Sequence, residues 1–348
     1  MTSVYDIRKL LLSLTTLAVL LVGFVSQAVS VFAEDPKTPS ARETVIVSQF
    51  GKEKFLLYLP FYVAMEEGLF AKRGIDIDLR FVGNDDQIFA TVISGDALFG
   101  IGDPVFAAIS REKGGPGRIV AMMVIKLGLS GFTNKKEIPE IQKPEDLKGL
   151  RISSFPAPST TYTLLTEFIN KYNLDKTGTH LVQAVIGAQL AVLEAGHVDI
   201  AIDLEPATSI AESKGYRINL AFDKFTDTQA ITGISTLDTT IKERPDLVQK
   251  IVSGLQEAQS LVLNDKDVPF RVAKKLFPTL NEQVIRNAVT RMLGYGVYSR
   301  SVKVDDAFWQ RTLKTRLDSK ELKKPQSTDF TVDNQFAEQA MKELGLGE

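Results

Sequence analysis

The sequence predicts an α/β protein of two lobes, each built on a mostly parallel sheet flanked by helices, with a ligand cleft between them. The chain has 348 residues, 44% of them hydrophobic and 24% charged, which is a globular composition large enough for two cores. Short apolar runs alternate with helical segments ended by glycine, which is typical of parallel strands joined by helical crossovers. The same order of five elements also occurs twice, about a hundred residues apart.

The first copy has a β-α-β-α-β order. Strands are predicted from β-branched and alternating residues at 44–50, 75–82 and 97–101. Helices are predicted at 62–73 and 85–94. Asn84 or Asp85 is suited to cap the second helix, and Gly74 and Gly95 are suited to end the two helices.

The second copy repeats this order. Its predicted strands lie at 150–155, 179–185 and 198–202, and its helices at 160–172 and 187–195. The endings of the two copies correspond, because each closes on an acidic residue before proline, Asp103-Pro104 in one and Glu205-Pro206 in the other. Two lobes of similar plan explain this correspondence better than coincidence does.

Further segments connect the lobes and complete the first one. Strand-like runs at 118–128, 217–222 and 229–235 are predicted to lead out to the second lobe and back. The remainder is predicted to be helical, at 245–263, 268–275, 281–292 and 332–344. Lobe one is therefore expected to be discontinuous, with residues 42–127 and 230–348, and lobe two to span residues 128–229.

The first 33 residues have the pattern of a secretory signal peptide. Arg8 and Lys9 precede an uncharged apolar run, and Ala33 offers a small residue at a cleavage point before Glu34. The alternative is an uncleaved N-terminal anchor over residues 10–33. Removing the segment takes away Asp6, Arg8 and Lys9, which changes the formal charge from −2 to −3. The mature chain is expected in the periplasm.

Composition excludes several classes of function. Lys and Arg total 41 against 43 for Asp and Glu, so no charge argument favours a nucleic-acid partner. The absence of cysteine excludes thiolate nucleophiles and Cys-ligated metals, and two histidines leave little for a His-based site. No phosphate loop or dinucleotide fingerprint occurs, because Gly100-Ile-Gly102 runs directly into Asp103-Pro104. No metal and no cofactor are predicted.

Residues 58–79 resemble the first helix and second strand of periplasmic solute-binding proteins of the nitrate/sulfonate/taurine class of ABC transporters. Further matches are residues 94–96, 145–152, 195–199 and Glu205-Pro206, in the order of that class. The resemblance covers roughly residues 43–260 and implies a periplasmic-binding-protein-like fold of type II. It implies a monomer without catalysis of its own, which delivers a small molecule to an inner-membrane permease and its ATPase.

Candidate ligand residues follow the predicted strands, because ligands of parallel α/β lobes bind beyond the carboxyl ends of the strands. Ser159, Thr160 and Thr161 open a helix, where hydroxyls and free backbone N–H groups suit an anion; the alternative is helix capping alone. Asp103 and Glu205 could accept amino or ring N–H groups; the alternatives are a solvated loop acid or an interlobe salt bridge.

Aromatic and loop residues complete the candidate set. Four aromatic side chains could flank a planar ligand, although such residues more often belong to a core: Phe50, Tyr58, Phe155 and Tyr162. The candidate ligand-binding residues are Phe50, Tyr58, Asn84, Asp103, Ser159, Thr160, Thr161, Gly187, Gln189 and Glu205.

The expected function is capture of a small organic molecule or a sulfonate- or taurine-like anion for import. The class also includes binders of thiamine-pyrimidine precursors, so a binder of such precursors or of another heterocycle is one alternative. An enzyme of pyrimidine or menaquinone precursor synthesis on the same fold is another, and an exported sensor domain is a third. The sequence does not name the ligand, since one scaffold hosts many.

Overall fold

The computed structural model describes residues 41–346. The predicted signal peptide and its cleavage after Ala33 lie outside the described residues. From Arg42 onward the chain forms one compact unit. Within residues 41–346, no helix is both long enough and apolar enough to cross a membrane.

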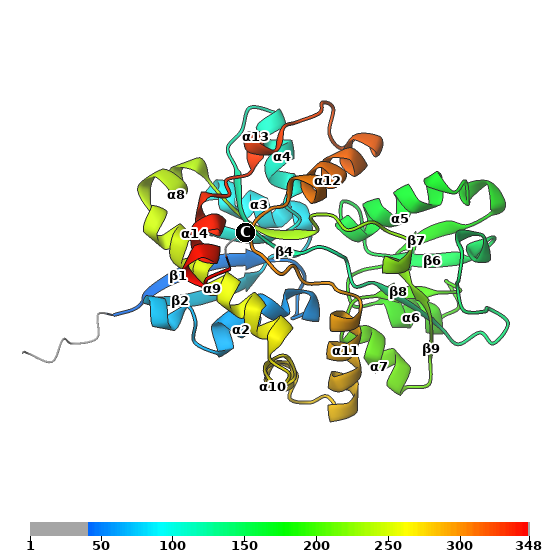
Figure 1. The fold of residues 1–348 in the computed structure, drawn as a ribbon. Coiled ribbons are helices and arrows are strands. Elements are labelled where there is room, and N and C mark those ends of the chain that lie inside the picture. Colours follow the sequence, from blue (N-terminus) through cyan, green and yellow to red (C-terminus); the bar gives the residue numbers. More distant parts are fainter. Residues whose placement is uncertain (1–40, 347–348) are drawn as a thin grey trace, which may run out of the picture. The chain divides into compact units, whose positions relative to one another are not determined.

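The first sheet has five strands in the order β2-β1-β3-β10-β4 (Figure 1). The strands are β1 (Glu43–Gln49), β2 (Ile75–Phe81), β3 (Phe99–Gly102), β4 (Arg118–Val124) and β10 (Thr232–Thr236). β1 is parallel to β2 and β3, as the first copy predicts. β10 returns from the far part of the sequence and pairs antiparallel with both β3 and β4. The sheet is therefore mixed, where a mostly parallel one was expected.

The second group of strands forms two sheets, one of three antiparallel strands and one of two parallel strands. Its members are β5 (Ser130–Thr133), β6 (Arg151–Ser154), β7 (His180–Gln183), β8 (Ala201–Asp203) and β9 (Arg217–Ala221). β6 is parallel to β7, and a parallel bridge joins Ile152 to Ile200. β5 pairs antiparallel with both β8 and β9.

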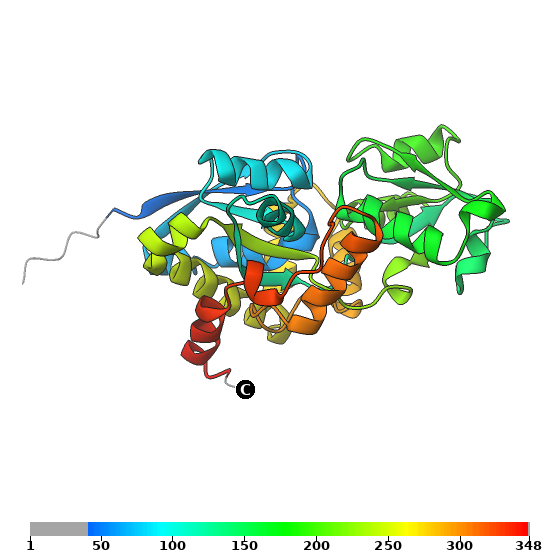
Figure 2. The same cartoon turned by 90° about the horizontal axis from the view of Figure 1, so that it is seen from above.

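Helices surround both groups of strands (Figures 1 and 2). The first set is α2 (Leu59–Glu66), α3 (Asp85–Ser94), α4 (Val105–Glu112), α5 (Thr160–Lys171), α6 (Gln189–Glu194) and α7 (Ala207–Ser213). The second set is α8 (Asp238–Glu243), α9 (Pro245–Asn264), α10 (Val268–Leu276), α11 (Glu282–Gly294), α12 (Asp306–Asp318), α13 (Thr328–Thr331) and α14 (Gln335–Glu343). Short 3₁₀ turns lie at Leu56–Tyr58, Ala71–Arg73, Pro144–Leu147, Asp175–Thr177 and Phe222–Lys224.

The helix predicted at 62–73 is the main correction among the elements that were predicted. It begins earlier, at Leu59, and ends at Glu66. Gly68 has φ +69°, a left-handed conformation that ends regular α-helix, and Ala71–Arg73 forms a separate 3₁₀ turn. The helices α4, α7, α8, α12 and α13 were not predicted.

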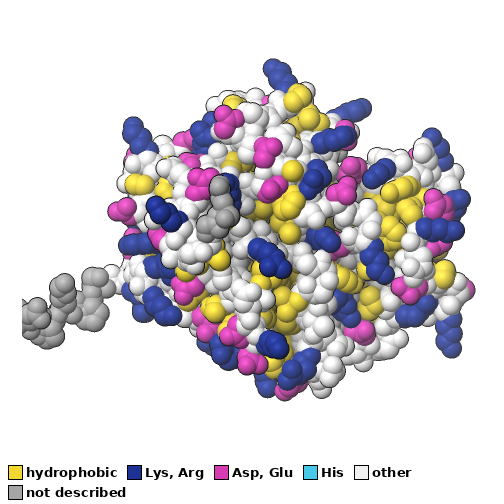
Figure 3. Space-filling view, in the orientation of Figure 1, with side chains coloured by type: hydrophobic (Ala, Val, Ile, Leu, Met, Phe, Trp, Pro, Cys, Tyr) yellow, Lys and Arg dark blue, Asp and Glu magenta, His cyan; other side chains and the backbone are white. Residues whose placement is uncertain are grey.

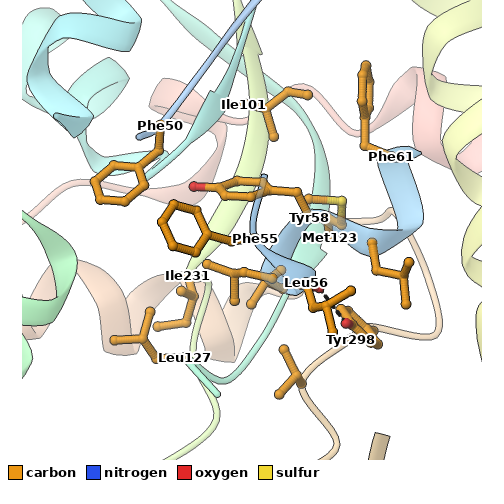
Figure 4. Close-up of a cluster of buried hydrophobic side chains, with 14 of the residues drawn as sticks. Phe50, Phe55, Leu56, Tyr58, Phe61, Ile101, Met123, Leu127, Ile231 and Tyr298 are labelled. Carbon is orange, nitrogen blue, oxygen red and sulfur yellow. Dashed lines mark hydrogen bonds between the residues drawn. The ribbon is translucent and has the colours of Figure 1, made fainter. Parts of the chain in front are cut away.

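A buried apolar cluster lies where the first sheet meets the turn at Leu56–Tyr58 (Figure 4). Figure 4 shows Phe50 and Phe55 beside Tyr58, whose hydroxyl points toward Phe50. The hydroxyl of Tyr298 donates to the Leu56 carbonyl at 2.5 Å, which fixes the turn from the opposite side. Phe50 and Tyr58, which were expected near a ligand, therefore also belong to the core.

Gly100 of β3 allows α3 to lie directly on the sheet. A Cβ at this position would stand 2.7 Å from Ile88 Cγ2, closer than real Cβ contacts allow. We expect Gly100→Ala to lower the free energy of unfolding by about 1–3 kcal/mol through overpacking, measured by urea denaturation. The matched control is Gly294→Ala in α11, where a Cβ meets nothing within 4 Å and stability should be kept or raised. Equal stability of Gly100→Ala and wild type would contradict this account.

Candidate functional site

A small cavity lies where the two groups of strands and both connecting segments meet. It measures about 20 Å³, enough for about one water molecule. Its walls come from the ends of β1, β6 and β8, the starts of α3, α5 and β10, and the turn at Leu56–Tyr58. The two segments that connect the groups of strands, residues 125–129 and 222–231, also contribute. The lining residues are Phe50, Leu57, Tyr58, Asp85, Leu127, Phe155, Thr160, Thr161, Leu204, Ile231 and Thr232.

Four of the ten predicted ligand residues line this cavity: Phe50, Tyr58, Thr160 and Thr161. The ring centroids of Phe50 and Phe155 are 6.1 Å apart with an angle of 30° between the planes, so these two rings form one aromatic wall. Burial raises the pKa of Tyr58, which keeps its hydroxyl protonated as a hydrogen-bond donor. Whether these residues contact a ligand stays a prediction.

Asp103 stands just outside the lining, in a cluster that joins the two halves of the site. Its carboxylate accepts a hydrogen bond from Thr160 Oγ1 at 2.5 Å and forms an ion pair with Arg316 of α12. Arg316 is 2% exposed; its Nη1 also donates to Thr163 Oγ1 at 2.7 Å and to Glu321 at 2.8 Å. Arg316 thus connects α12 to the loop after β3 and to the first turn of α5.

Asp85, the first residue of α3, places a carboxylate in the cavity wall. The side chain is buried, with 6% of the residue exposed. Its two oxygens accept long hydrogen bonds from Thr160 N at 3.3 Å and Asp103 N at 3.4 Å. Burial raises the pKa of Asp85 to about 7, and the neighbouring Asp103 carboxylate adds to the rise. The start of α5, where an anionic ligand was expected, therefore already faces a carboxylate of the protein.

Glu205 is held by an ion pair. Glu205 is fully buried. Its carboxylate forms an ion pair with Arg291 of α11 and accepts a hydrogen bond from Ser209 N at 3.0 Å. Arg291 also donates to Ser209 Oγ at 2.8 Å and to Glu212 at 2.7 Å. This is the salt-bridge alternative weighed for Glu205, and no Glu205 atom lines the cavity. A ligand contact at Glu205 stays an untested prediction.

The other four predicted residues serve local structure or lie elsewhere. Asn84 is the N-cap of α3, and its backbone N–H donates to Gln87 Oε1 at 2.9 Å. Ser159 caps α5 by accepting from Tyr162 N at 3.2 Å. Gln189 is buried and its amide donates to the Ala184 carbonyl at 3.4 Å, while Gly187 adopts φ +87° in the preceding turn. None of the four is among the residues that line the cavity.

A larger groove of about 980 Å³ lies beside the cavity, between α5, the returning connection at residues 225–229 and α12. Both views of the ribbon place α12 next to α5 (Figures 1 and 2). Thr163 and Glu321 line this groove, and both contact Arg316. The Arg316 cluster therefore lies between the cavity and the groove. The strand ends open on the cavity, so the cavity is the candidate ligand site.

The charged side chains of the described residues do not indicate a site of another kind, such as a metal site. Among residues 41–346, no group of three His, Cys, Asp or Glu side chains is placed to hold a metal ion. On the face shown in Figure 3, Lys and Arg side chains are interspersed with Asp and Glu.

Comparison with known proteins gives a consistent picture. A family model described as NMT1/THI5 like matches residues 57–267. The riboflavin-binding protein RibY of Chloroflexus aurantiacus is 23% identical over 274 residues, covering 73% of this chain and 75% of that protein. The taurine-binding periplasmic protein of Escherichia coli is 27% identical over 220 residues, covering 60% of this chain and 65% of its own length.

Solved structures show the fold. The periplasmic nitrate-binding protein NrtA from Synechocystis PCC 6803 superposes with a TM-score of 0.68 at 13% identity, covering 88% of this chain and 90% of that one. The desulfurization enzyme DSZB superposes with a TM-score of 0.62 at 16% identity, covering 87% of this chain and 100% of that one. The chain therefore has the periplasmic-binding-protein fold, and its resemblance to the nitrate/sulfonate/taurine binding proteins is confirmed.

Proposed function

The chain belongs to the NMT1/THI5-like family, and from this premise we propose that it is the substrate-binding component of an ABC importer. It captures a small organic molecule or anion in the cleft and delivers it to an inner-membrane permease with its ATPase. It acts as a monomer in the periplasm after its signal peptide is cleaved near Ala33. It catalyses no reaction and needs no cofactor.

The observation that carries this proposal is the position of the cavity. Strand ends from both sheet groups and both connecting segments, through Leu127 and Ile231, line one space. We assign residues 42–127 and 230–348 to lobe one and residues 128–229 to lobe two. A ligand that touches both lobes favours the closed arrangement over the open one, because it gains contacts only when they meet. The small cavity corresponds to a closed arrangement that must open to admit ligand.

Two alternatives have specific support. RibY is named for riboflavin binding, which favours the alternative that this chain binds a thiamine-precursor or another heterocycle rather than a sulfonate. DSZB is an enzyme on the same fold, so an enzyme is the second alternative. The described cavity wall offers one carboxylate, three threonine hydroxyls and a tyrosine hydroxyl, without a histidine, which favours binding over proton-transfer chemistry.

A thermal-shift panel tests the proposed function. The panel holds nitrate, bicarbonate, alkanesulfonates, taurine, aminopyrimidines, aromatic carboxylates and riboflavin. A true ligand at a hundred times its dissociation constant should stabilise the protein by about 2.7 kcal/mol, and Tm should rise by several degrees. Tyr58→Phe and Thr160→Val should each reduce that shift, because each removes a hydroxyl from the cavity wall.

Thr239→Val is the matched control, because Thr239 is exposed at the distant helix α8 and should leave the ligand-induced shift unchanged. A saturable shift that Tyr58→Phe and Thr160→Val leave intact would place binding elsewhere. Turnover of a panel member would instead favour the enzyme alternative.

A further inference from the structure

Asp85 has no cationic partner of its own in the cavity wall. The two backbone N–H groups that reach it are at 3.3 and 3.4 Å, beyond the usual length of a hydrogen bond to a carboxylate. No Lys, Arg or His is among the residues that line the cavity. The amino end of α3 gives some compensation, because helix dipoles favour negative charge there. A buried carboxylate held this weakly lacks most of what it needs to stay ionised.

The surrounding charges leave a negative excess. Asp103 and Glu321 share one guanidinium, that of Arg316. Asp85 is close enough to this cluster for the Asp103 carboxylate to raise its pKa and for Arg316 to lower it, and burial raises it further. Three carboxylates therefore meet one cation, and only Glu321 has much access to water, with a quarter of its side chain exposed. A bound proton or a bound cation would balance the cluster.

We propose that Asp85 is the specificity-determining residue of the cleft and that the ligand presents to it a cationic, N–H-donating group such as an amidinium, guanidinium or ammonium. This inference rests on the function proposed above. The ligand group would lie between the Asp85 carboxylate and the aromatic wall of Phe50 and Phe155. Aromatic faces attract such cations, and a carboxylate binds them with charge-assisted hydrogen bonds.

The same geometry disfavours a simple anion. The backbone N–H of Thr160 at the start of α5 is one donor that an anion would use, and it already points at the Asp85 carboxylate, at 3.3 Å. An anion at that position would meet the Asp85 carboxylate and, through Thr160 Oγ1, the Asp103 carboxylate. A zwitterion such as taurine fits only if its ammonium group faces Asp85.

Three probes that share a phenyl ring test the proposal: benzamidinium, benzamide and benzenesulfonate. Their dissociation constants are measured by calorimetry at pH 8 and pH 6. We expect benzamidinium to bind at least about tenfold more tightly than benzenesulfonate at pH 8, from one charge-assisted contact. We expect this preference to shrink at pH 6, because a proton then competes for the Asp85 carboxylate. This pH comparison needs no variant.

Asp85→Asn should remove the preference for benzamidinium over benzamide while leaving benzamide binding within about twofold. Asp86→Asn is the matched control, because Asp86 is the next residue of α3 and is exposed. It should leave all three dissociation constants unchanged. Thermal melting of both variants without ligand checks that each is folded.

The outcomes separate the two proposals. Benzenesulfonate binding at least as tightly as benzamidinium, absence of benzamidinium binding, or an equal effect of the Asp86 control would each overturn the role of Asp85. If benzenesulfonate binds at least as tightly as benzamidinium and Thr160→Val weakens the binding of benzenesulfonate, the proposed binding function stands and only the proposed ligand class is wrong. If neither these probes nor any compound of the earlier panel binds, the proposed function itself fails.

Discussion

Replacing Arg316 with methionine is expected to lower the free energy of unfolding by about 3–5 kcal/mol, the range for breaking a buried ion pair. Methionine keeps much of the volume but removes the cation, so Asp103 stays buried without its partner. Thr163 and Glu321 lose a donor in the same step. Urea denaturation at pH 7 measures the loss.

Lys314→Met on the same helix is the matched control. Lys314 pairs with Asp318 at the surface, where the two side chains are 73% and 48% exposed. Solvent screens such an exposed pair and it contributes little to stability, so the control should stay close to wild type. Adding Asp103→Asn to Arg316→Met should recover part of the loss, because it removes the unpaired charge. Equal stabilities for Arg316→Met and Lys314→Met would show that the Arg316 cluster contributes nothing to the folded state.

Asp203→Asn is expected to stabilise the protein at pH 8 by up to about 4 kcal/mol. Asp203 is 3% exposed, and its carboxylate accepts a hydrogen bond from Leu204 N at 2.8 Å. Burial raises the pKa of Asp203 to about 7, and the Glu53 and Glu205 carboxylates add to the rise. A group with a raised pKa in the folded state stabilises that state below pH 4, and the contribution is lost as the pH rises through about 7. Asparagine cannot ionise, so it avoids that loss.

The measurement is urea denaturation of wild type and variant at pH 5 and pH 8. The difference between them should be larger at pH 8 than at pH 5. Asp227→Asn, at an exposed position of the returning connection, is the control and should show little change at either pH. A difference that is the same at both pH values would mean that Asp203 titrates normally, and a destabilised variant at pH 8 would mean that its charge is needed.

Capping residues and left-handed glycines predicted the ends of the helices in which they occur. Asn84 and Gly95 bracket α3 as expected, with Gly95 at φ +83°, because capping and left-handed glycine are properties of neighbouring residues. The cavity position followed from the rule on strand ends, and Phe50, Tyr58, Thr160 and Thr161 are where that rule places them.

Contacts between residues far apart in the chain could not be predicted from the sequence. The helix α12 was missed because three of its five buried residues are polar, Thr312, Thr315 and Arg316, which hides the apolar period. Asp85 was considered only as a helix cap, since nothing in its neighbourhood says that α5 will cover it. The ion pair of Glu205 joins residues far apart in the sequence, so only the fold could reveal Arg291 as its partner.

The place of β10 has a consequence for the order in which the chain acquires its structure. β10 lies between β3 and β4 and pairs with both. Until residues 232–236 have been synthesised, β3 pairs only with β1, and β4 has no neighbouring strand in this sheet. The second group of strands is contiguous in the sequence and can close first, while the first sheet waits for a distant return. Long-range strand pairing of this kind is slow because the intervening loop must be ordered. A chain truncated at residue 229 should therefore leave the first sheet unfinished. We expect this sheet, which contains the first strands to be made, to be completed after the second group of strands.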